Sequence, residues 1–457
     1  MALPNAGSCS PQPDGGSDRD DASTFFTILT PTNNSGVLGL GRVTLDGTTL
    51  QVDVVASGLT PGEIHPLHIH GFFEGGDERT PVVADDLDED GFVETPEAEA
   101  AIGPVIAGLT TDEAEAVLGT VSPDFPVADE NGIVNFSQTY ELDPNDPDDA
   151  FILDKLSDRV EGRFLEFHGL TLPAGEGDGT GNEVNGTAGY NPLVPVAGGE
   201  LTDLGGLAGR VLSDLPSWAF TSLASGALSF LMPYMLSPDG TGPAAPEDPA
   251  VVAAGQEGDT FVALLTPSNN SGVLGLAVAE FDEEEGTVEV SVWASGLTPG
   301  QVHPQHIHGF ENDQPSLLPN ISLDTDADGF VESPEGEPVI GPVLLSATAS
   351  GEVTNVPVSE DFPRADEDGN LEFNQTYSFN LAEEDDAFIF QQLQDRFVGR
   401  EYQIHGLEVL PNQGEGTVNE VNGAGGYIDV LPVANGVFLP LDASLVGNLL
   451  SENWLLS

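Results

Sequence analysis

Short runs of alternating apolar and polar residues recur along the chain, and they predict β-strands. Residues 51–55, Gln-Val-Asp-Val-Val, and residues 288–292, Val-Glu-Val-Ser-Val, alternate or run apolar and are rich in β-branched valine. Glycine-containing pairs typical of hairpin tips and chain reversals separate such runs: Asp46-Gly47, Glu285-Gly286, Asn131-Gly132 and Asp368-Gly369. The regular succession of short strands predicts an all-β protein whose units are antiparallel β-sandwiches or Greek-key barrels.

The sequence contains two copies of one unit. The segment TFFTILTPTNNSGVLGL, which starts at Thr24, recurs as TFVALLTPSNNSGVLGL from Thr260, and SGLTPGEIHPLHIHGF from Ser57 recurs as SGLTPGQVHPQHIHGF from Ser295. Such repetition indicates two homologous domains in tandem. We expect a flexible N-terminal tether at residues 1–22, a first domain at 23–200, an apolar helical tail and a Pro/Gly-rich linker at 201–258, a second domain at 259–438 and an apolar C-terminal tail at 439–457.

Two apolar stretches raise the question of membrane insertion. Residues 216–237 carry no charged side chain, but serines, a threonine, a glycine and Pro233 dilute their hydrophobicity. Residues 445–456 are too few to span a bilayer as a helix and include Glu452. We therefore interpret both stretches as short helical tails that pack on their own domains or pair with a partner.

Acidic residues outnumber basic residues by a wide margin. The chain has 77 Asp plus Glu against 10 Lys plus Arg, which gives a formal net charge of -67. Such a field repels nucleic acid and anionic membranes and attracts cations, so we expect metal cations as partners and no nucleic acid. Because self-repulsion strains a compact fold unless salt or divalent ions neutralise it, the composition implies a saline or calcium-containing environment. Composition alone leaves open whether the acidity is general or marks dedicated calcium sites.

The chain has one cysteine, Cys9, so it cannot form an intrachain disulfide. Residues 6–9, Ala-Gly-Ser-Cys, resemble the end of a bacterial lipoprotein signal, although the apolar region of such a signal is absent. Two interpretations stay open. Cys9 is either a lipidation site that anchors the chain to a membrane, or a free thiol in a disordered N-terminus.

All eight histidines fall at positions that match between the two copies. The candidate ligands of a copper or zinc ion are His65, His68, His70 and His168 in the first copy, and His303, His306, His308 and His405 in the second. Histidines two apart on a strand project from the same face, and a histidine from another strand can supply a third imidazole. Three imidazoles suit Zn²⁺ or Cu²⁺. The alternative is that buried imidazoles only bond to backbone carbonyls and brace the fold. The offset of His65 from the strand pair indicates a different role for it.

Each copy also contains the Asp-x-Asp-x-Asp-Gly-x5-Glu pattern of calcium-binding loops. The candidate calcium ligands are Asp86, Asp88, Asp90, Phe92, Glu94 and Glu97 in the first copy, and Asp324, Asp326, Asp328, Phe330, Glu332 and Glu335 in the second, with both phenylalanines acting through the backbone carbonyl. The alternative is that these acids are simply solvated, as surface acids usually are. Pro96 and Pro334 argue against a regular helix after the loop, so we expect a calcium loop outside a standard EF-hand.

The segment Gly-Leu-Thr-Pro-Gly-x-x-His-Pro-x-His-Ile-His-Gly, at residues 58–71 and 296–309, resembles the CHRD, or chordin-type, domain. The later Phe/Ile-His-Gly and Asn-Glu-Val-Asn-Gly motifs extend the resemblance over most of both copies. It implies β-rich domains that are extracellular, periplasmic or attached to the cell surface.

The same segment is similar to the copper-ligand strand of copper/zinc superoxide dismutases, which are Greek-key barrels. That likeness implies that His68 and His70 match two copper ligands, His65 a structural histidine and His168 the last copper ligand. The chain has no histidine between His70 and His168, where the dismutases carry bridging and zinc-loop histidines. The likeness therefore favours a mononuclear copper site over full dismutase activity.

These patterns predict a non-enzymatic, calcium-stabilised surface protein with one copper or zinc site in each domain. Its partners would be metal cations and surface or matrix proteins. One alternative is a copper-dependent redox enzyme of dismutase type. Another is a structural or adhesive matrix module in which the histidines only brace the fold. The sequence shows no nucleophile elbow or phosphate loop, so it gives no support for nucleophilic or nucleotide chemistry.

Overall fold

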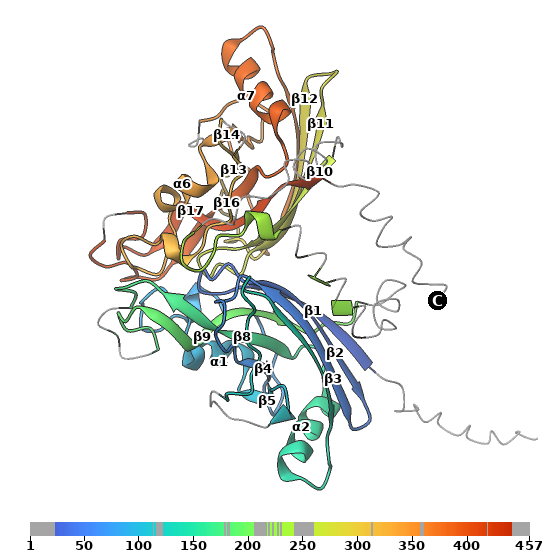
Figure 1. The fold of residues 1–457 in the computed structure, drawn as a ribbon. Helices are drawn as coiled ribbons and strands as arrows, with labels where there is room; N and C mark the ends of the chain where they lie inside the picture. The colour runs from blue at the N-terminus through green and yellow to red at the C-terminus, as the bar shows by residue number, and fades with distance from the viewer. Residues whose placement is uncertain are drawn as a thin grey trace, which may run out of the picture.

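Each repeat folds into one antiparallel β-sheet that curls around its own core, and the two sheets lie one above the other in Figure 1. The structure is a computed structural model. It describes residues 23–112, 114–115, 122–177, 180, 183–204, 217, 220–221, 224–225, 228, 231–241, 260–311, 314–356, 361–417 and 419–440.

The first sheet has the strand order β6-β5-β4-β8-β9-β1-β2-β3-β7. Its strands are β1 (Ser23–Pro31), β2 (Leu38–Asp46), β3 (Thr49–Ser57), β4 (Leu67–His70), β5 (Val105–Leu109), β6 (Ala114–Glu115), β7 (Val134–Glu141), β8 (Phe164–Leu172) and β9 (Gly189–Glu200). Most of β1 pairs with β2, whereas its last two residues, Thr30 and Pro31, pair with β9. One strand therefore belongs to both halves of the sheet, and the sheet curls at this strand.

The second sheet repeats this order as β14-β13-β16-β17-β10-β11-β12-β15, and the short β18 pairs with β10. Its strands are β10 (Thr260–Pro267), β11 (Leu274–Asp282), β12 (Thr287–Ser295), β13 (Gln305–His308), β14 (Val343–Ser346), β15 (Leu371–Ser378), β16 (Glu401–Val409), β17 (Gly426–Val437) and β18 (Leu439–Pro440). The prediction of two tandem antiparallel all-β domains is confirmed.

Short helices connect the strands. They are α1 (Thr95–Ile102), α2 (Pro147–Asp158), α6 (Ser333–Ile340) and α7 (Glu384–Asp395), with 3-10 turns η1 (Val83–Asp85), η2 (Met232–Tyr234) and η3 (Ile321–Leu323). The prediction that Pro96 prevents a helix after the aspartate loop is wrong, because α1 begins at Thr95 and holds Pro96 in its first turn. There the missing N–H of proline has no intrahelical partner to lose. Pro334 occupies the same place in α6.

Alternating side chains of the strands build the core, as the hydrophobic pattern predicts. Val52 and Val54 of β3 are fully buried, whereas Gln51 is partly exposed. Between them Asp53 is also buried, because it forms an ion pair at 2.6 Å with Arg42 of the neighbouring β2. The second repeat replaces this ion pair with a valine on β11 opposite a serine on β12, at positions 278 and 291.

The two domains meet through the loop that follows the first strand of each repeat. Asn33 and Asn34 both have positive φ, 53° and 48°, which asparagine tolerates better than most residues. The backbone N–H of Asn33 donates to Oδ1 of Asn270, and that of Asn269 donates to Oδ1 of Asn34, each at 2.7 Å. Amide side chains exchange further bonds of 2.9 and 3.1 Å across the same contact. Each bond from one repeat has its counterpart from the other, so the contact has approximate two-fold symmetry.

The apolar stretch at residues 216–237 is described in part, and that part packs on the protein. The ring of Phe220 is buried, with its centroid 6.2 Å from that of Phe26. Met235 and Tyr234 join the core cluster of the second domain. Among the described residues, no helix is long and apolar enough to cross a membrane. Cys9 and the predicted tail at residues 445–456 lie outside the described residues.

Candidate metal centres

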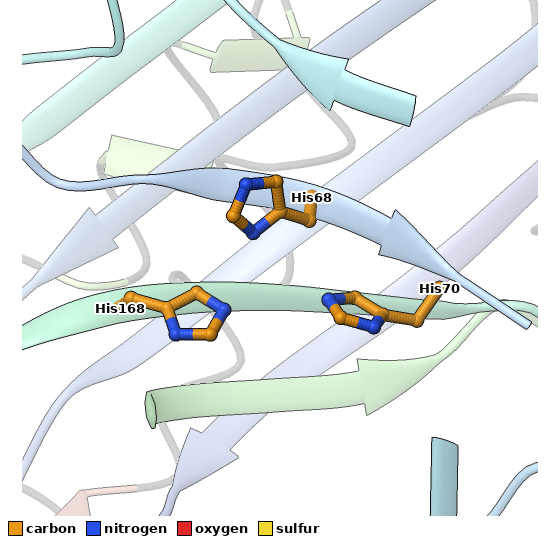
Figure 2. Close-up of side chains that lie close together, drawn as sticks. All are labelled: His68, His70 and His168. Atoms are coloured by element: carbon orange, nitrogen blue, oxygen red, sulfur yellow. The ribbon is translucent and has the colours of Figure 1, made fainter. Parts of the chain in front are cut away.

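Three histidines of the first domain meet on one face of the sheet. His68 and His70 come from β4, and His168 comes from the adjacent β8, which pairs with β4 in antiparallel register. Figure 2 shows the three rings turned toward one another. One ring nitrogen from each lies within 4.8 Å of the others. Ile69 points to the opposite face and is fully buried in the core, so the alternation predicted from sequence positions the pair.

Backbone carbonyls fix how these rings are turned. Nδ1 of His70 lies 3.0 Å from the carbonyl oxygen of Gly103, and Nδ1 of His168 lies 2.7 Å from that of Leu193. A nitrogen that bonds to a carbonyl must carry the hydrogen, so Nε2 of each ring keeps the lone pair. Nε2 of His70 and both nitrogens of His68 are buried without a hydrogen-bond partner, whereas Nε2 of His168 faces a carboxylate, that of Glu166. A carbonyl on one nitrogen and a free lone pair on the other is the arrangement that protein zinc and copper sites use.

Glu166 belongs to the same cluster. Its Oε2 atom lies 3.0 Å from Nε2 of His168 and 3.4 Å from Nε2 of His70, and its side chain is fully buried. Burial alone would raise the pKa of Glu166, but the two imidazoles beside it lower that pKa overall. Burial likewise opposes protonation of His168, yet the Glu166 carboxylate raises the pKa of this ring overall. The histidine pattern did not predict Glu166, although a residue two positions before His168 on a strand must share its face.

The second domain repeats the three histidines without the carboxylate. His306, His308 and His405 again bring one nitrogen each within 4.8 Å of one another. The position of Glu166 is taken by Gln403, which faces His306 in the pairing of β13 with β16. Burial lowers the pKa of His308 to about 4, and burial together with the neighbouring His308 lowers that of His405 to about 3. Both rings are therefore neutral at physiological pH, as metal ligands must be.

The structure leaves His65 and His303 out of these clusters. Nδ1 of His65 lies 2.9 Å from the carbonyl oxygen of His168, and its Nε2 lies 3.1 Å from that of Thr60. His303 makes the matching contacts with His405 and Thr298. Both nitrogens of each ring face backbone carbonyls, so neither tautomer directs a lone pair at a metal. These two histidines brace the backbone of the strand that carries the third imidazole.

The aspartate loop of the first domain forms two groups of carboxylates instead of one. Asp86, Asp88 and Glu97 make up the first group, and Asp88 is shared with a second group that contains Asp90 and Glu94. Helix α1 closes the loop: the N–H of Glu94 donates to Glu97 Oε2 at 3.2 Å. Phe92 is fully buried in the core, and its N–H donates to Asp90 Oδ1 at 2.9 Å.

Several carboxylate oxygens in this loop are buried without a partner. They include Oδ2 of Asp90 and Oε2 of Glu94. Burial and neighbouring carboxylates raise the pKa of Asp90 to about 8 and that of Glu94 to about 7. A group of buried anions is costly unless a cation or protons neutralise it.

The second loop has the same construction. Asp324, Asp326 and Glu335 form a group within 4.8 Å, and buried oxygens of Asp326, Asp328 and Glu332 have no partner. Phe330 is buried like its counterpart in the first loop.

Comparison of the sequence with models of known protein families and with curated proteins gave no match. The resemblance to the chordin-type domain therefore stays a prediction, and the assignment of function depends on the two kinds of cluster described above.

Proposed function

We propose that this protein binds transition-metal ions, one copper or zinc ion between the three clustered histidines of each domain. The observation that carries the proposal is the fixed orientation of His70 and His168: each Nδ1 bonds to a backbone carbonyl, and one ring nitrogen from each of the three histidines lies within 4.8 Å of the others. Imidazole nitrogens are the ligands that both metals accept most readily in proteins.

A purely structural role explains this geometry less well. A bracing histidine, such as His65, faces a carbonyl with each nitrogen. In the cluster, by contrast, Nε2 of His70 and both nitrogens of His68 are buried and unpaired. Each unpaired buried polar group costs about 1–3 kcal/mol, and one shared ion would satisfy them together.

The two sites would differ in charge. In the first domain Glu166 would place an anion beside a divalent ion, either as a fourth ligand or as a neighbour. In the second domain Gln403 offers a neutral amide. The first site should therefore attract divalent cations more strongly. At the second site protons compete less with the metal for the ring nitrogens, because the imidazoles are already neutral.

Burial of the cluster favours binding over redox turnover. His68, His70 and His168 are 6%, 2% and 2% exposed. A dismutase-type reaction requires a metal position that solvent and substrate can reach, which this degree of burial restricts. We therefore infer metal binding as the activity, and we infer a cell-surface, periplasmic or extracellular setting from the acidic composition and the chordin-type motifs.

The test is elemental analysis of the full chain, purified without a histidine tag and loaded separately with Cu²⁺ or Zn²⁺. We expect two ions per chain, one in His168→Ala, and none in His168→Ala combined with His405→Ala. His65→Gln is the matched control, because His65 is a buried histidine outside the cluster, and it should keep both ions. Circular dichroism verifies that each variant is folded.

Retention of both ions by the double variant would contradict the proposal. So would a melting temperature that falls equally in His168→Ala with and without metal, since that result marks a bracing histidine.

A further inference from the structure

The aspartate loops of the two repeats face each other across the domain contact. Gly91 of the first loop and Gly329 of the second lie so close that a Cβ atom on Gly91 would be 2.1 Å from the carbonyl oxygen of Asp328. The amide of Asn34 also reaches across and donates to the carbonyl of Gly329 at 3.0 Å. The second aspartate loop is therefore part of the contact between the domains.

Glu176 of the first domain points into the aspartate loop of the second. It follows β8 and is 1% exposed, and no N–H group of the described residues donates to its carboxylate oxygens; the side chain that it contacts is the Asp324 carboxyl of the second loop. The groups that act on it electrostatically are the carboxylates of Asp324, Asp328 and Glu335, all from the other domain. Burial, followed by these carboxylates, raises the pKa of Glu176 to about 10. A buried carboxylate in that position needs either a shared proton or a cation.

The equivalent position of the second repeat is occupied by an amide. Gln413 crosses in the opposite direction, and its Nε2 donates to Oδ2 of Asp86 in the first loop at 2.7 Å. Beside it, Asn412 donates to Glu89 at 2.8 Å. Glu176 and Gln413 are related by the same approximate two-fold symmetry as the asparagine contact. Glu176 places a carboxyl group in the loop of the other domain, whereas Gln413 places an amide there.

We propose that Ca²⁺ binds the aspartate loop of the second domain with Glu176 of the first domain as one of its ligands, so that calcium joins the two domains. Ca²⁺ prefers six to eight oxygen ligands, mostly carboxylates and carbonyls, and its affinity rises with ligand charge. The second loop supplies Asp324, Asp326 and Glu335 as one group, and Glu176 adds a carboxylate from outside it. The first loop receives only the neutral Gln413, so it binds calcium more weakly.

The experiment exchanges the two crossing residues in the full chain. Calcium is removed with a chelating resin, and binding of CaCl₂ is followed by isothermal titration calorimetry, with MgCl₂ as the comparison cation. We expect Glu176→Gln to weaken the tightest calcium site about 10- to 100-fold and Gln413→Glu to strengthen the weaker one. The second variant is the matched control, because it changes the same position of the other repeat in the opposite direction.

Thermal unfolding provides a second test that distinguishes loss of a calcium ligand from a variant that binds calcium poorly because it is misfolded. In chelator, Glu176→Gln removes a buried unpaired carboxylate and should raise the melting temperature. In millimolar calcium, the same substitution removes a ligand and should lower it.

Hydrogen exchange of the asparagine contact at residues 31–36 and 267–272 then reports on the domain contact itself. Calcium should slow this exchange in the wild-type chain and have a smaller effect in Glu176→Gln. Wild-type calcium affinity in Glu176→Gln, or calcium binding that leaves the exchange of these loops unchanged, would overturn the proposal.

Discussion

Replacing Glu166 with glutamine should give the metal site of the first domain the neutral amide that Gln403 provides in the second. The carboxylate lies 3.0 Å from Nε2 of His168 in a fully buried position. An ion bound to His168 would lie a few ångströms from this carboxylate, and two unit charges about 4 Å apart interact by about 4 kcal/mol at an effective dielectric constant of 20. An amide dipole keeps part of this attraction, so we expect Glu166→Gln to cost about 2–3 kcal/mol of zinc binding, which is about 30- to 150-fold in affinity.

The assay is a competition titration of Zn²⁺ against a chromophoric chelator at pH 7. A His306→Ala background removes the second site, so that only the first domain is measured. The reverse substitution, Gln403→Glu in a His68→Ala background, should strengthen the second site by a similar factor. An affinity of Glu166→Gln within about threefold of its parent would refute the reasoning, because the buried carboxylate would then contribute no net attraction to the bound ion.

Three further outcomes follow from the structure. Arg42→Val leaves Asp53 buried without its cation and should lower the free energy of unfolding, measured in urea, by about 3–5 kcal/mol. The double variant Arg42→Val with Asp53→Ser has the same residue pair as the second repeat and should regain most of this loss. Gly91→Ala places a methyl group against the other domain and should speed hydrogen exchange at the domain contact, whereas Gly62→Ala, also at positive φ but in open space, should not. In chelator, stability should fall as the pH rises from about 4 to about 8, by up to about 1.4 kcal/mol per pH unit for Asp90 alone, because folding raises the pKa of this carboxyl from 3.8 to about 8. Urea titrations should show this slope disappear in calcium.

The fold can be predicted because local sequence patterns specify its strands and turns, and the repeat presents each pattern in two copies. Alternation in residues 51–55 predicts a strand, and the structure has β3 from Thr49 to Ser57. The Asp46-Gly47 pair predicts a hairpin tip, and Asp46 pairs with Thr49 across it. The two-residue spacing of His68 and His70 predicts a shared face, which the structure shows.

The remainder of the site depends on neighbours that spacing does not specify. Glu166 matters because β8 lies beside β4, and that pairing joins residues about a hundred positions apart. Glu176 reaches the second aspartate loop only because of the way the two domains contact each other. A single glutamate in a glycine-rich segment gives no sequence pattern that predicts this contact. Pro96 predicts a break in the helix, but the effect of a proline on a helix depends on whether it lies in the first turn, as here, or later.

The reciprocal asparagine bonds also bear on the ancestry of the chain. When each partner uses the same patch, the surface is complementary to itself, as in homodimers built on a two-fold axis. Fusion of two subunits of such a dimer would give a tandem chain with this interface already in place. The linker would then only raise the local concentration of two surfaces that already fit. It would also free each copy to diverge, as the glutamate and glutamine at the two crossings have done.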